Sequence, residues 1–111
     1  MKTMNAQLLD RHSRRILQGT RTDVCRHLGV PRLRPEMVSE LYLKIRDTLA
    51  QTASAADAVR RETVDDLAVT IYMVAVAEDK PGPALLTDLK RTLADVLKPD
   101  LGPAARGSEN P

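Results

Sequence analysis

The chain has 111 residues, enough for one small domain, and its only aromatic residues are two tyrosines. A core without tryptophan or phenylalanine must be built from Leu, Val, Ile, Met and Ala, which favours packed helices, and a single cysteine excludes an internal disulfide. The net charge is only +2, but residues 1–46 carry ten Lys and Arg against four acids, and residues 47–111 carry seven against eleven.

The N-terminal segment predicts two helices. The first spans residues 4–18, where apolar side chains recur at four-residue spacing, and we expect Gly19 to end it as its C-cap. A short second helix over residues 22–28 ends at Gly29, which has the same C-cap role. The connector at residues 30–35 contains two prolines, and each proline restricts the residue before it.

A third helix is predicted over residues 35–52, because Pro35 suits the first helical position and a regular apolar stripe follows. That stripe consists of Val38, Leu41, Ile45 and Leu49. Residues 54–62 form either a separate short helix or the start of the next one, and the pattern does not decide between them.

Residues 63–79 contain the longest apolar run of the chain, Ala68 to Ala77, which is broken only by Thr70. Thr63 suits the N-cap, with Asp66 placed to complete a capping box. A helix that is apolar on all sides is a buried one, so we expect this helix at the centre of the fold. A strand is the alternative, but no second strand is evident to pair with it. The run is also shorter than the ~20 apolar residues of a membrane span.

The last predicted helix covers residues 83–98, and the Pro-, Gly- and Ser-rich tail at residues 99–111 is expected to be disordered. Residues 1–98 therefore form a single all-α domain of four to five helices around the helix at residues 63–79. Because a core of this size and composition is marginal for a monomer, we also expect a homodimer. The expected interface consists of Leu67, Ile71, Tyr72, Val74, Leu89 and Leu93.

Arginine is the only basic residue type between residues 11 and 34, and Asp23 is the only acid there. The guanidinium group forks onto phosphate oxygens and stays charged at any useful pH, so this asymmetry indicates an anionic partner. The predicted nucleic-acid-binding residues are Arg11, Arg14, Arg15, Arg21, Arg26, Arg32 and Arg34. The alternative is a solvated face whose arginines pair with the acids of residues 47–111.

Residues 22–41 resemble a helix-turn-helix, because the small residue Cys25 lies four positions before Gly29. Pro31 and Pro35 depart from that motif, since they fall where the recognition helix should begin and continue. The alternative is two packed helices joined by a proline-containing connector.

No enzyme activity, metal or cofactor is expected. Cys25, His27 and His12 do not have a standard ligand spacing, and His12 falls on an apolar stripe. The adjacent acids Asp65 and Asp66 diverge on a helix and are better explained by capping than by acid–base chemistry. No secretory signal is recognised at the start of the sequence, so a cytoplasmic protein is expected.

The function predicted from these features is a small DNA-binding or transcription-associated regulator that uses its arginine-rich first half. The alternative is a protein-binding adaptor, such as an anti-activator, a phage inhibitor or a helical chaperone, whose arginines meet an acidic protein surface. A purely structural subunit, for example of a phage particle, is a third possibility.

Overall fold

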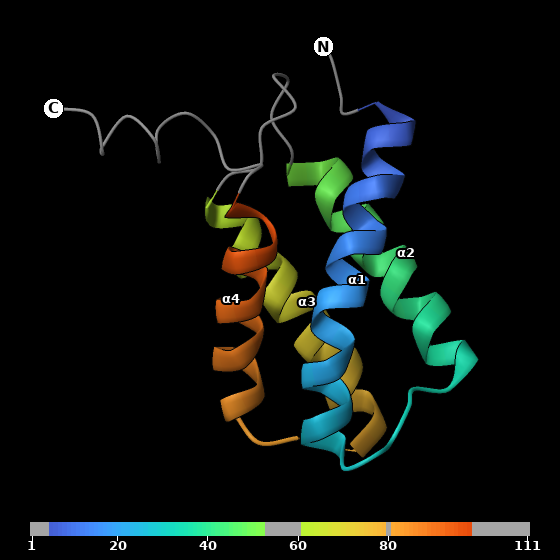
Figure 1. Ribbon diagram of the computed structural model, residues 1–111, viewed down its shortest axis with the longest axis vertical. Helices are drawn as coiled ribbons and strands as arrows, with labels where there is room; N and C mark the ends of the chain where they lie inside the picture. Colours follow the sequence, from blue (N-terminus) through green and yellow to red (C-terminus); the bar gives the residue numbers. More distant parts are fainter. Residues whose placement is uncertain (1–4, 53–60, 80, 99–111) are drawn as a thin grey trace, which may run out of the picture.

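The computed structural model describes residues 5–52, 61–79 and 81–98. These residues form four α-helices and no strand: α1 (Ala6–Leu28), α2 (Pro35–Thr52), α3 (Arg61–Asp79) and α4 (Ala84–Val96). Successive helices run in alternating directions, with α1 and α4 in front of α2 and α3 (Figure 1). The all-α prediction is confirmed. Within the described ranges, no helix is long and apolar enough to cross a membrane.

One continuous helix, α1, replaces the two helices predicted before residue 29. At its start, the Asn5 side chain accepts hydrogen bonds from the backbone N–H groups of Gln7 and Leu8 at 2.7 and 3.3 Å. At its end, Gly29 adopts the left-handed conformation with φ of 71°, which confirms its predicted C-cap role. The prediction that Gly19 ends a helix is wrong, because α1 passes straight through it.

Gly19 is required where α1 and α4 approach each other closely. A Cβ atom built on Gly19 would lie 2.6 Å from Cγ2 of Val96, closer than side chains tolerate. The glycine therefore permits close packing of two helices rather than a change of chain direction. Above this contact, the Nη2 atom of Arg15 donates a 2.7 Å hydrogen bond to the backbone carbonyl of Val96 in the last turn of α4.

The helix α3 differs from its prediction in two ways. It begins at Arg61, so Thr63 is a buried residue of the first turn and not the N-cap. It is also buried on one side only, because Val69 and Met73 are 47% and 59% exposed. Its main contacts are with α2 and α4, just as α1 contacts the same two helices, so the bundle is a ring of four helices. The expected helix buried on all sides at the centre is not observed.

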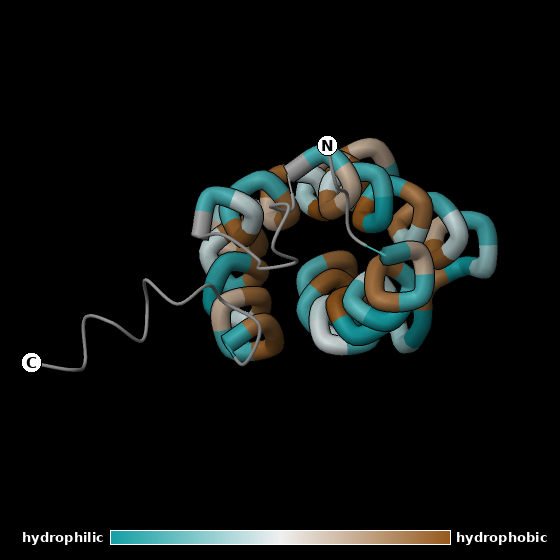
Figure 2. The backbone as a smooth tube through the Cα atoms, turned by 90° about the horizontal axis from the view of Figure 1, so that it is seen from above, coloured by the Kyte–Doolittle hydropathy of each residue, from teal (hydrophilic) through white to brown (hydrophobic). Residues whose placement is uncertain are grey.

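The core lies inside this ring, and the hydrophobic segments of all four helices contribute to it (Figure 2). Three residues of the predicted α2 stripe, Leu41, Ile45 and Leu49, are buried together with Met37, whereas the fourth, Val38, is only half-buried. The helix α4 contributes one leucine per turn, all fully buried: Leu85, Leu89, Leu93 and Leu97. The end of α3 at Asp79 and the start of α4 at Ala84 agree with the predicted stop at the proline-rich turn.

The expected dimer-interface residues belong mainly to this core. Leu67, Ile71, Leu89 and Leu93 have no exposed surface and Val74 is 6% exposed. Tyr72 is half-buried, with its hydroxyl 3.5 Å from the Pro81 carbonyl. These aliphatic side chains therefore stabilise the single chain and leave almost no surface for a second copy to contact.

The close contact at Gly19 predicts that Gly19→Ala destabilises the fold. Overpacking costs about 1–3 kcal/mol, which outweighs the gain in helix propensity of about 1 kcal/mol. The melting temperature should fall by roughly 4–8 °C for each net kcal/mol lost. The matched control is Gly82→Ala, because a Cβ there meets no atom within 4 Å. In a Val96→Ala background the same change should cost nothing; an equal cost in both backgrounds would contradict this account.

Candidate functional site

The helices α1 and α2 form an antiparallel hairpin. Tyr42 on α2 donates a short hydrogen bond to Asp10, near the start of α1, while Leu28 and Met37 border one hollow at the opposite end. The connector at residues 29–34 is longer than the turn of about three to four residues in a helix-turn-helix, and it contains Pro31. The helix-turn-helix interpretation is therefore not supported, and the structure matches the alternative of two packed helices joined by a connector.

A groove lies on the outer side of this hairpin. Its cavity volume is about 520 Å³. The side chains that line it come equally from α1 and α2 and are Arg14, Leu17, Gln18, Arg21, Val38, Ser39, Tyr42 and Leu43. Leu43 is 60% exposed, the highest fraction among the large hydrophobic residues on the described surface. The groove therefore combines an apolar wall with two arginines.

A hydrogen-bonded group at one end of the groove holds Arg14 in place. The carboxylate of Asp10 accepts from the Tyr42 hydroxyl and, at 2.9 Å, from Nε of Arg14. The Arg14 guanidinium carbon lies 5.6 Å from the centroid of the Tyr42 ring, within the range of a cation–π contact. Arg14 is thus held in position by its neighbours, although 73% of its side chain is exposed.

The same contacts shift the pKa values of the three groups. The Tyr42 hydrogen bond, followed by that from Arg14, lowers the pKa of Asp10. The hydrogen bond to Asp10 raises the pKa of Tyr42 and likewise raises the pKa of Arg14. The cluster is therefore held as a carboxylate, a neutral phenol and a guanidinium cation.

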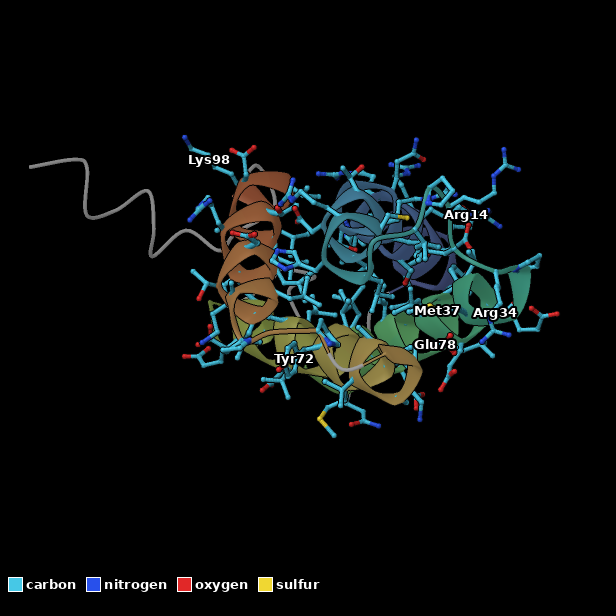
Figure 3. All side chains as sticks on the ribbon, turned by 90° about the horizontal axis from the view of Figure 1, so that it is seen from below. Arg14, Arg34, Met37, Tyr72, Glu78 and Lys98 are labelled. Carbon is cyan, nitrogen blue, oxygen red and sulfur yellow. The ribbon has the colours of Figure 1, made fainter. Side chains whose placement is uncertain are left out.

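Besides Arg14, which pairs with Asp10, three of the seven predicted phosphate-binding arginines have partners within the chain. Arg15 bonds to the end of α4, as described above. Arg26 contacts Asp23 at 2.9 Å and Asp88 at 3.3 Å. Arg34 contacts Glu78 at 2.5 Å, and the two side chains point toward each other in Figure 3. The alternative of arginines that pair with acids of the second half is therefore correct for Arg26 and Arg34.

The other four arginines face solvent. Arg11, Arg14 and Arg21 lie on the outer face of α1, and Arg32 lies in the connector. Among the described residues, no ion pair involves Arg11, Arg21 or Arg32. At 1.5 Å per residue, Arg11 and Arg21 are separated by about 15 Å along the helix. Of the seven predicted arginines, only Arg14 and Arg21 border the groove.

A second polar cluster joins α1 to α4. Nε2 of His27 lies 2.7 Å from Oδ2 of Asp88, which also contacts Arg26, while Oδ1 of Asp88 lies 3.5 Å from Arg91. The His27 hydrogen bond is the largest influence that lowers the pKa of Asp88. His27 is thus engaged with a carboxylate, His12 is buried, and no metal-like group of three ligands occurs in the described ranges. This cluster connects helices and does not line the groove.

The apolar wall of the groove was not predicted as a site. Val38 belongs to the predicted stripe of α2, but Val38 and Leu17 are both only half-buried and line the groove. The available signal was Leu43, an apolar residue that lies outside the stripe of Val38, Leu41, Ile45 and Leu49. Comparisons with protein-family models, with curated proteins and with solved structures found no match to this chain.

Asp10→Asn is predicted to change the pH dependence of stability. A carboxyl group whose pKa is lowered in the folded state stabilises it above the unfolded pKa of about 3.9, and this contribution disappears as pH falls through the folded value. The variant should therefore unfold at lower urea concentration at pH 7, with the difference vanishing in acid. Tyr42→Phe, which keeps the ring, should reproduce part of the loss. A difference from wild type that is the same at every pH would contradict the prediction.

Asp88→Asn should destabilise the contact between α1 and α4, because one carboxylate serves His27, Arg26 and Arg91. We expect a lower urea midpoint at pH 7 with an unchanged slope. Asp95→Asn is the control, since Asp95 is an exposed acid of the same helix. Equal midpoints for the two variants would show that the cluster contributes no stability.

Proposed function

We propose that the protein is a non-enzymatic adaptor that binds an acidic, partly apolar helical segment of another protein in the groove between α1 and α2. One observation carries the proposal: the groove places Arg14 and Arg21 beside an apolar wall that contains the exposed Leu43. An amphipathic helix that presents apolar residues at i, i+3 or i+4, and i+7 suits such a groove. Acidic residues on its flanks would meet the two arginines.

The two kinds of side chain have different roles in this proposal. Exposed charges mainly steer association and set specificity, because water and salt screen them. The affinity must therefore come from apolar surface, at about 25 cal/mol per Å² removed from water. Leu43 supplies such surface, as it is 60% exposed in the free chain. Asp10 supports binding by keeping Arg14 in one orientation before the partner arrives.

Nucleic-acid binding is the second candidate, and the observation that favours it is the row of Arg11, Arg14 and Arg21 on one helix face. Arg15, Arg26 and Arg34 are engaged elsewhere, so about three phosphate contacts would give log K a salt slope of roughly −3. This candidate gives no role to Leu43, since phosphates make no use of an exposed leucine. The protein partner is therefore preferred.

The test compares three fluorescent ligands. The first, the patterned peptide, is a helix with leucines along one face and glutamates beside them. The second is a scrambled peptide of the same composition, and the third is a random DNA duplex. We expect anisotropy to detect the patterned peptide with a dissociation constant of about 1–100 μM, and the scrambled peptide to bind at least about ten-fold more weakly. Leu43→Glu should abolish binding. Met73→Glu is its matched control, because Met73 is 59% exposed but lies on α3.

The arginines are tested in the same assay. Arg21→Glu should weaken peptide binding by about ten-fold, and Arg32→Glu in the connector should leave it unchanged. If the DNA duplex binds at low salt with an affinity that Leu43→Glu does not alter, and neither peptide binds, the adaptor proposal is overturned in favour of the second candidate.

A further inference from the structure

The outer surface of α3 carries a stripe that is opposite in charge to the groove. Glu62, Asp66, Val69 and Met73 are all exposed, and their spacing of four, three and four residues places them on one side of the helix. The remaining exposed acid of the first turns, Asp65, lies 4.0 Å from Lys90 of α4. The stripe is therefore acidic in its first half and apolar in its second half.

This stripe has the features that the proposed function requires of a ligand. Its acids can meet Arg14 and Arg21, and Val69 and Met73 can contact the apolar wall that includes Leu43. On α1 the groove extends from Arg14 to Arg21, about 10 Å along the helix, which equals the length of the stripe from Glu62 to Val69. The two surfaces agree in that each carries charges beside apolar side chains, with opposite signs of charge.

The stripe cannot reach the groove of its own chain. In the ring, α1 and α3 are not neighbours, and Figure 3 places Arg14 on the side of the bundle opposite α3. Contact between the two surfaces therefore requires a second copy of the chain. Because they are different surfaces, the contact is heterologous and leaves one groove and one stripe free at the two ends of a pair.

We infer that copies of this protein associate head to tail, with the acidic stripe of α3 in one copy seated in the α1–α2 groove of the next. This inference rests on the proposed function, since it uses the same groove and the same class of helical ligand. Self-association would therefore use the α3 stripe and the α1–α2 groove, and not the interface residues expected from the sequence. A stripe of four side chains on one helix is much smaller than the roughly 20–30 residues that each partner contributes to a standard interface, so the association is weak and depends on concentration.

The seated stripe occupies the groove that an external partner would use. Self-association and partner binding are therefore mutually exclusive at each groove, and a partner at high concentration separates the assembled copies. The free ends allow assemblies longer than two copies.

Sedimentation velocity of three proteins tests the inference. The wild type should show a sedimentation coefficient that rises between about 10 μM and about 1 mM, and salt should reduce the rise. A groove variant, Arg14→Glu with Arg21→Glu, and a stripe variant, Glu62→Lys with Asp66→Lys, should each remain monomeric. Arg32→Glu and Asp95→Lys are the controls on other exposed positions and should associate as the wild type does.

The deciding sample is an equal mixture of the groove variant and the stripe variant. In that mixture the intact stripe of the groove variant can meet the intact groove of the stripe variant, and the charge-reversed groove also meets the charge-reversed stripe, so the mixture should regain the association that each variant alone has lost. A monomeric mixture, a wild type that stays monomeric, or a groove variant that still dimerises would each overturn head-to-tail association.

These failures can be separated from a failure of the proposed function. If the wild type stays monomeric while the patterned peptide still binds and Leu43→Glu abolishes that binding, only the second-copy inference is lost. If neither association nor peptide binding is detected, the groove is not the binding site for a helical segment.

Discussion

The fold depends on the close approach of α1 to α4 at Gly19. A side chain at this position would overlap Val96, so the absence of a Cβ lets 23 residues continue as one helix against its neighbour. Because α1 is continuous, its outer face carries Arg11, Arg14 and Arg21 in a single row, and its flank forms the groove with α2. A break at Gly19 would have separated these residues onto two helices.

Much of this architecture could be predicted from periodicity and helix-end signals. Pro35 at the start of α2 and Gly29 after α1 occupy their predicted places, because a chain obeys local rules where no tertiary contact opposes them. Gly19 could not be assigned, since glycine serves both at helix ends and at close helix contacts, and only the position of Val96 distinguishes the two. Met73 shows the same limit, because an apolar run does not reveal which of its sides faces solvent.

The candidate site could be predicted only in part. Charge counting drew attention to the arginines, but partners more than 40 residues away determine which of them are available: Arg34 pairs with Glu78, and Arg26 with Asp88. Leu43 was overlooked because its significance depends on α1 lying beside it. Which arginines pair with distant acids is thus a tertiary property, and together with the exposed Leu43 it leads us to propose recognition of an acidic, apolar segment rather than phosphate contact.

The most direct measurement of the central claim is an NMR titration of the methyl-labelled protein with the patterned peptide. The account predicts that the largest shift changes occur at the methyl groups of Leu17, Val38 and Leu43, with those of the buried α4 leucines nearly unchanged. Changes confined to the connector between α1 and α2 or to the surface of α4, with the groove methyl groups unaffected, would contradict it.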